Sequence, residues 1–125
     1  MKLTDKRPSQ KLYRVYAKFA NINGITLGTK VKIGGVDVGN VHSISLEEDH
    51  TVLVSLNIKF GIKIPVDSCL KVSTIGLIGG RYLRIDAGGE EEILHSGDRF
   101  DFTESAVDLE DMISRFLLER APNAE

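Results

Sequence analysis

Several features are scarce in this sequence, and each absence excludes a class of protein. There is one cysteine, Cys69, so no internal disulfide can form. No run approaches the roughly 20 apolar residues that a helix needs to cross a bilayer, so we expect the chain as given to be soluble. Residues 1–11 also lack the apolar segment of a secretory signal. The formal net charge of −2 argues against a nucleic-acid partner, which requires a basic face.

Residue types that are typical of catalysis occur in the sequence, but their spacing does not match a catalytic or metal-binding motif. His42, His50 and His95 lie in unrelated local contexts, and none has metal-ligand spacing with another candidate ligand. Cys69 lies in a strand pattern, where a buried small side chain is expected more often than a nucleophile. The run Glu90-Glu-Glu is typical of a charged surface rather than of a placed acid–base pair. We therefore expect no enzyme, no cofactor and no metal site.

Alternating apolar residues dominate most of the chain and predict β-strands. Residues 13–19 alternate between an apolar and a basic face, and residues 52–60 alternate most clearly of all. Residues 31–38 contain two short β-branched segments around Gly34-Gly35, which predicts a hairpin. Gly39 interrupts the following strand pattern and indicates a bulge or a sharp bend. Residues 93–102 are interpreted as a last short strand and its approach.

The period changes near the C-terminus. Ser105 resembles a helix cap, and the apolar residues that follow recur at helical spacing. This stripe comprises Leu109, Met112, Ile113, Phe116 and Leu117. It packs either on the subunit's own barrel or on other copies in an assembly, and its position near the chain end favours assembly. Short strands, glycine-marked corners and one terminal helix predict an all-β fold, a small closed or nearly closed β-barrel with a C-terminal α-helix.

Residues 73–85 contain the most unusual pattern in the chain. Two large aliphatic residues, Leu77 and Ile78, lie between Gly76 and the pair Gly79-Gly80, in a stretch flanked by strand patterns. Glycine permits the backbone conformations of a tight turn, whose tip normally carries polar residues. Two interpretations remain open: the aliphatic pair folds back onto its own core, or it meets apolar surface in an assembly.

Charge is unevenly distributed along the chain. Between Lys2 and Lys18 the charged residues are basic except Asp5, whereas between Asp86 and Asp111 they are acidic except Arg99. If the two regions lie on opposite faces, the molecule is electrostatically two-sided. A solvated surface with no partner is the alternative.

Three spaced motifs, taken together, resemble the mammalian cell entry (MCE) domain family. The motifs are Val-Lys-Ile-Gly-Gly-Val-Asp-Val-Gly-Asn-Val at residues 31–41, Ile-Pro-Val-Asp-Ser at 64–68, and residues 72–85; Gly97-Asp98 fits as well. The chain is most similar to the MlaD-type subunits of Mla phospholipid-trafficking ABC transporters, over roughly residues 13–118. The resemblance implies a flexible lead-in at 1–12 where members carry a transmembrane helix, a seven-stranded MCE barrel at 13–103, and a C-terminal helix and tail at 104–125.

The resemblance also implies a function, an assembly and a set of partners. It implies a phospholipid-binding and transfer subunit, a homohexameric ring with an apolar central pore, on the periplasmic side of the Gram-negative inner membrane. Partners would be an ABC permease, an ATPase and a soluble periplasmic lipid carrier, in the maintenance of outer-membrane lipid asymmetry. The family's pore loop maps onto Ile75, Gly76, Leu77, Ile78 and Gly79. The alternative is an MCE-like oligomeric scaffold that bridges the membrane complex and its partners without conducting lipid.

Overall fold

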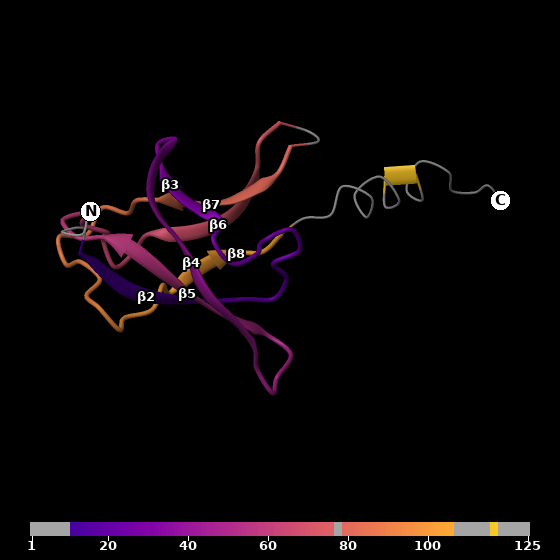
Figure 1. Ribbon diagram of the computed structural model, residues 1–125, viewed down its shortest axis with the longest axis horizontal. Coiled ribbons are helices and arrows are strands. Elements are labelled where there is room, and N and C mark those ends of the chain that lie inside the picture. The colour runs from indigo at the N-terminus through magenta and orange to yellow at the C-terminus, as the bar shows by residue number, and fades with distance from the viewer. Residues whose placement is uncertain (1–10, 77–78, 107–115, 118–125) are drawn as a thin grey trace, which may run out of the picture.

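The chain forms one curled, mixed β-sheet, in which some neighbouring strands are antiparallel and others are parallel (Figure 1). The computed structural model describes residues 11–76, 79–106 and 116–117. Its seven strands have the order β2-β5-β4-β3-β7-β6-β8. Their bounds are Leu12–Phe19 (β2), Lys30–Ile33 (β3), Val36–Leu46 (β4), Val52–Lys59 (β5), Cys69–Thr74 (β6), Arg81–Asp86 (β7) and Phe102–Glu104 (β8). The predicted all-β, seven-stranded class is confirmed.

The two outer strands of this sheet meet through the segment that leads into β8. The backbone N–H of Tyr16 in β2 donates to the carbonyl of Asp98 at 3.0 Å, and Phe100 N–H donates to the carbonyl of Tyr16 at 2.9 Å. A further bond runs from Gly97 N–H to the carbonyl of Arg14, at 2.7 Å. These bonds satisfy backbone groups that an open sheet would leave unpaired. The sheet therefore curls into a barrel whose edges are joined.

The core lies inside this barrel and follows the alternation of the sequence. Val15 pairs with Leu56 and Ala17 with Val54 across β2 and β5, and all four side chains are buried. The other buried apolar residues are Phe19, Ile25, Val31, Val38, Val41, Ile58, Ile64, Leu70, Leu83, Ile85, Leu94 and Phe100. The predicted apolar faces of residues 13–19 and of most of 52–60 are confirmed.

The glycine at position 39 has the structural role that its place in the strand pattern predicted. The β3–β4 register shifts between Val31 and Lys32, where a bulge begins beside Gly39. A Cβ atom on Gly39 would lie 2.0 Å from the carbonyl oxygen of Asn57 in β5. The backbones of β4 and β5 approach too closely there for any side chain.

Two strand predictions need correction. Phe60 is not the last inward residue of β5, because the strand ends at Lys59 and Gly61 turns the chain with a φ of 99°, which leaves Phe60 72% exposed. The last strand begins at Phe102, later than expected, and Ile93 makes only an isolated bridge with Pro65.

The predicted C-terminal helix lies largely outside the described residues, which include only Phe116 and Leu117 as a helical turn. The hydroxyl oxygen of Ser105, expected to cap that helix, accepts hydrogen bonds from the N–H groups of Ala20 and Asn21 at 2.9 and 3.2 Å. It therefore fixes the end of β2. Among residues 11–76, 79–106 and 116–117, no helix has the length and apolar character needed to span a bilayer.

The strand directions divide the barrel into two ends. The hairpin end carries the β6–β7 connection, the β4–β5 connection and the chain leaving β8 (Figure 1). The opposite end, called here the cavity end, carries the start of β2, residues 60–68 and residues 87–96.

Candidate functional site

The β6–β7 hairpin carries the predicted pore loop. Its ladder runs from Cys69 opposite Asp86 to Thr74 opposite Arg81, and one more hydrogen bond follows, from Ile75 N–H to the carbonyl of Gly80 at 2.9 Å. Ile75 and Gly80 therefore extend a continuous antiparallel pair, and Gly76 and Gly79 follow them toward the tip. The hairpin projects from the barrel at the upper right of Figure 1.

Two glycines of this tip occupy positions that other residues would strain. Gly76 has a φ of 71°, in the left-handed region that L side chains rarely adopt. A Cβ atom on Gly79 would lie 1.8 Å from the carbonyl oxygen of Ile75. At Gly80 a Cβ atom would have no described residue within 4 Å. The tight turn thus depends on Gly76 and Gly79 for different physical reasons.

The hairpin extends past the end of the hydrophobic core. Val72 pairs with the fully buried Leu83 and is itself only partly buried. Nearer the tip, Ile75 is 57% exposed. An exposed aliphatic residue on a projecting hairpin is available to contact another apolar surface. Leu77 and Ile78 lie outside the described residues, so their position remains a prediction.

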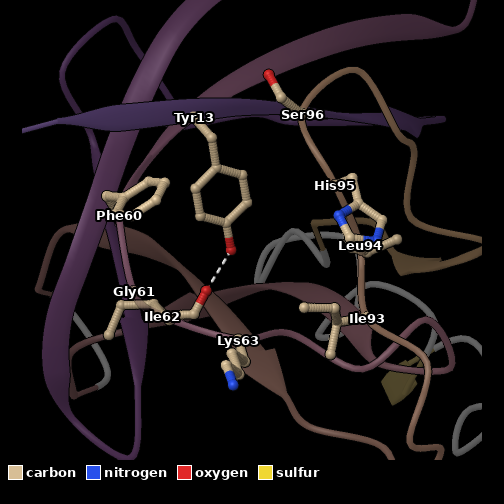
Figure 2. A pocket seen from close by; sticks show the side chains of 9 residues that line it. All are labelled: Tyr13, Phe60, Gly61, Ile62, Lys63, Ile93, Leu94, His95 and Ser96. Carbon is tan, nitrogen blue, oxygen red and sulfur yellow. Dashed lines mark hydrogen bonds between the residues drawn. The ribbon is translucent and has the colours of Figure 1, made fainter.

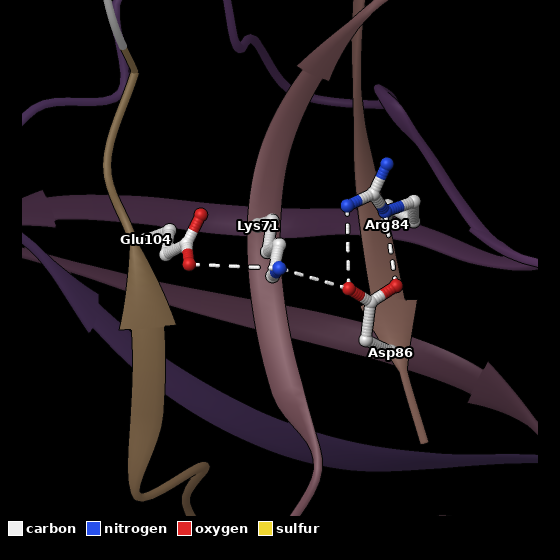
Figure 3. Close-up of polar contacts among 4 residues, drawn as sticks. All are labelled: Lys71, Arg84, Asp86 and Glu104. Carbon is white, nitrogen blue, oxygen red and sulfur yellow. Dashed lines mark hydrogen bonds and ion pairs between the residues drawn. The ribbon is translucent and has the colours of Figure 1, made fainter. Parts of the chain in front are cut away.

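An ion-pair network fixes the base of this hairpin on the outer face of the barrel (Figure 3). Lys71 of β6 places its Nζ atom 2.9 Å from Asp86 of β7 and 3.5 Å from Glu104 of β8. Arg84 contacts the same aspartate through Nε at 3.0 Å and donates from Nη2 at 3.2 Å. The hydrogen bond from Lys71, followed by that from Arg84, lowers the pKa of Asp86. The network therefore links three strands through side chains as well as through the backbone.

Arg81 braces the hairpin on its other side. Its Nη1 atom donates to the carbonyl of Asn23 at 3.0 Å. The side chain passes so close to Gly24 that a Cβ atom on that residue would lie 2.7 Å from Arg81 Cδ. The loop between β2 and β3 thus holds the first residue of β7.

Of the other predicted site residues, only Phe116 and Leu117 lie among the described residues. Phe116 and Leu117 are 54% and 59% exposed, whereas Leu109, Met112 and Ile113 of the stripe lie outside the described residues. In the part of the chain that the structure describes, no group of three or more His, Cys, Asp or Glu side chains gathers as metal ligands would.

Candidate catalytic residues are likewise scattered. His42 lies on β4, His50 in the β4–β5 turn and His95 at the cavity end. Burial raises the pKa of the Cys69 thiol, with the nearby Glu104 adding to the effect. A raised pKa disfavours the thiolate that a nucleophile requires.

The structure also contains a cavity that the sequence analysis missed. A hollow of about 350 Å³ lies at the cavity end, between the start of β2, residues 60–63 and residues 93–96 (Figure 2). Its apolar wall comes from Tyr13, Phe60, Ile62, Ile93 and Leu94. The available signal was the apolar residues of three separate segments, and these segments must meet to form the hollow.

A small closed barrel with a projecting apolar hairpin and an apolar hollow defines a binding module. Comparison with known proteins agrees: the family model described as "MlaD protein" matches residues 11–88. The chain belongs to the MlaD family.

Individual relatives carry consistent names. A Haemophilus influenzae protein named "Intermembrane phospholipid transport system binding protein MlaD" is 37% identical, over 86% of this chain and 67% of the relative. The Escherichia coli K12 protein of the same name is 39% identical, over 87% of this chain and 63% of the relative. This chain thus spans about two-thirds of the length of these curated relatives. They are named as binding proteins of a transport system, which agrees with the expectation of a non-enzyme.

A solved structure shares the fold. A chain of the "Acinetobacter MlaFEDB complex in ATP-bound Vtrans1 conformation" superposes with a TM-score of 0.80 and 25% sequence identity. The match covers 86% of this chain and 82% of that chain.

Proposed function

We propose that this chain is the phospholipid-binding subunit of an ABC-type intermembrane transport system. In this proposal it assembles as a homohexameric ring, and the β6–β7 hairpin of each copy lines a central apolar pore. The relatives' names and the ATP-bound transporter complex among the structural matches support the substrate class and the ABC permease and ATPase partners.

The observation that carries the proposal is the projecting hairpin. Its tip depends on Gly76 and Gly79, its Ile75 is exposed, and Leu83 is its last fully buried residue before the tip. In a ring, a heterologous interface repeats around one axis, so one loop from each copy can converge there. Convergence would cover Ile75, Leu77 and Ile78 with their own copies and with lipid.

An apolar collar of this kind selects acyl chains over ions. Hydrophobic constrictions dewet and so impede ions. An acyl chain instead gains about 0.8 kcal/mol for each methylene removed from water. The collar would guide lipid passively, and the energy for directional movement would come from the ATPase partner.

The barrel's two ends support an orientation for the assembly. The first described residues lie at the cavity end, and the chain leaves β8 at the hairpin end. We place the cavity end toward the inner membrane, on its periplasmic side, and the hairpin end toward a soluble lipid carrier. The stripe of Leu109, Met112, Ile113, Phe116 and Leu117 would then join the copies at the carrier-facing side. The exposure of Phe116 and Leu117 supports that role.

The proposal is tested by replacing both Leu77 and Ile78 with asparagine in the assembled complex. Native mass spectrometry should still detect the hexamer, while retained phospholipid and lipid transfer both fall. Leu46→Asn is the matched control, because Leu46 is 69% exposed at the same end and lies on a different hairpin. Unchanged transfer in the double variant would contradict the pore. A hexamer that retains no lipid even in the wild type would favour the non-conducting scaffold.

A further inference from the structure

The cavity at the end opposite the hairpin has a wall suited to an apolar ligand. In Figure 2 the Tyr13 ring stands between Phe60 on one side and Ile93 and Leu94 on the other. Its volume of about 350 Å³ falls in the range of small-molecule sites, roughly 300–1,000 Å³. No residue of the predicted pore loop contributes to it.

Three polar groups along this wall have partners within the chain. The Tyr13 hydroxyl donates to the carbonyl of Ile62 (Figure 2), and burial raises the pKa of Tyr13, so the hydroxyl stays neutral. Leu94 N–H donates to the carbonyl of Ile64 at 2.8 Å, and the Ser96 hydroxyl accepts from Arg14 N–H at 3.4 Å. A polar ligand would therefore find few free groups in the wall and would lose its own hydration.

The mouth of the cavity has a different character. Phe60 is 72% exposed there, and Lys63 and His95 are the basic side chains among the lining residues, which include no acid. Within the described part of the chain, neither the Lys63 ammonium nor the His95 ring has a hydrogen-bond or ion-pair partner. The acidic run at residues 90–92 precedes Ile93 in sequence but does not line the hollow.

We propose that this cavity binds one acyl chain of a lipid whose anionic head group contacts Lys63 and His95. The apolar wall would take the chain, and Phe60 would cover its first methylenes. The phosphate would form charge-assisted hydrogen bonds with the cationic mouth. The inference rests on the proposed function for its ligand class, and it assigns a lipid contact separate from the hairpin, at the other end of the barrel.

The test uses dodecyl phosphate below its micelle-forming concentration, with the folded full chain. Amide shifts in two-dimensional NMR should change at Gly61, Ile62 and Leu94 and saturate, while the amides of Ile75 and Gly76 stay unchanged. Inorganic phosphate alone should shift none of these amide signals. It has no acyl chain, so it gains no free energy from burial in the apolar wall. Dodecyltrimethylammonium, which has the same chain and a cationic head, should bind more weakly by about tenfold.

Two variants separate the chain from the head group. Ile93→Asn should weaken dodecyl phosphate by about tenfold, since it places a polar group in the apolar wall. Lys63→Gln should weaken the binding of dodecyl phosphate about threefold. The loss of the ammonium group should also remove much of the preference for an anionic head group. Leu46→Asn, which is exposed and at the hairpin end, should bind as the wild type does. Circular dichroism checks that each variant is folded, and Lys63→Gln breaks no hydrogen bond or ion pair within the described residues.

Several outcomes would overturn the inference. Shifts centred on the hairpin, equal binding of the two detergents, or wild-type affinity in both Ile93→Asn and Lys63→Gln would each do so. Binding only above the micelle concentration would indicate an adventitious detergent, and saturable shifts with phosphate alone would indicate a free-anion site. The Leu77→Asn/Ile78→Asn variant should bind dodecyl phosphate normally. If it loses retained phospholipid while the wild-type cavity binds nothing, the proposed function stands and this inference fails.

Discussion

The two ends of the barrel differ in where their apolar side chains lie. At the hairpin end, Ile75 is carried outward past the core on a glycine-framed turn. At the cavity end, Ile62, Ile93 and Leu94 turn inward around a hollow. In our proposals the outward tip is covered by other copies and by lipid, whereas the hollow is filled by one acyl chain. The same barrel thus offers one surface suited to assembly and one suited to a small amphiphile.

A substitution in the core, which lies between the two ends, should lower the free energy of unfolding more than a substitution at either end. Leu83 is fully buried between Val31 and Val72 on its neighbouring strands. Leu83→Ala leaves a cavity and should lower the free energy of unfolding by about 2–5 kcal/mol in urea titrations. Leu27→Ala, at a residue 66% exposed, should change it by less than about 0.5 kcal/mol. If Leu83→Ala changed the free energy of unfolding by less than about 1 kcal/mol, Leu83 would not be part of a core that stabilises the whole barrel.

A methyl group at the cavity end should act mainly on stability. A Cβ atom on Gly88 would lie 2.0 Å from Oδ1 of Asp67, a carboxylate that accepts the N–H groups of Gly89 and Glu90 at 3.0 and 3.1 Å. Gly88→Ala should therefore cost about 1–3 kcal/mol of unfolding free energy, because these bonds must break or shift. Gly89→Ala is the matched control, since nothing lies within 4 Å of its Cβ position. Equal stabilities of the two variants would contradict this arrangement.

A methyl group at the hairpin end should act mainly on function. Gly79→Ala brings Cβ against the carbonyl of Ile75, so the tip must change conformation. Because this tip lies beyond the core, the unfolding free energy should fall by less than about 1 kcal/mol. Retained phospholipid should fall sharply, as measured by lipid extraction from the purified complex. Gly80→Ala, whose Cβ atom would have no described residue within 4 Å, should retain lipid normally. If the Gly79→Ala complex retained as much phospholipid as the wild type, lipid binding would not depend on the conformation of this turn.

The ion-pair network at the hairpin base should contribute least, and its contribution should depend on pH. Hydrogen bonds from Lys71 and Arg84 lower the pKa of Asp86 in the folded state. The stabilisation is therefore complete above the ordinary aspartate pKa of about 3.9 and is lost as the pH falls through the lowered folded-state value. Asp86→Asn should be slightly less stable at pH 7 and should lose less stability on acidification. Parallel acid-unfolding curves for the two proteins would contradict this assignment.

Local patterns predicted much of the fold. The faces of β2 and β5 followed from alternation, the β3–β4 turn from Gly34-Gly35, and the bulge from Gly39, since each signal lies within a few neighbouring residues. Position 60 was misjudged because alternation alone does not show where Gly61 turns the chain. The last strand was misplaced because β8 pairs with β6, more than thirty residues earlier in the chain.

The candidate sites divide in the same way. The β6–β7 turn was predictable because its glycines are adjacent in sequence, whereas its role as a pore loop stays a prediction. The cavity was not, because Tyr13, Ile62 and Ile93 meet only when the barrel closes. The network of Lys71, Asp86 and Glu104 likewise depends on the pairing of three strands.

The central claim is that the projecting hairpin meets lipid on a shared axis. Its most direct test is a photo-crosslinking residue placed at Ile75 in the assembled complex, with the same residue at Phe102 as control. Both side chains are more than half exposed, at 57% and 54%. The account predicts phospholipid adducts and adducts between copies from position 75, with few lipid adducts from position 102. Equal lipid labelling at both positions, or none at position 75, would contradict it.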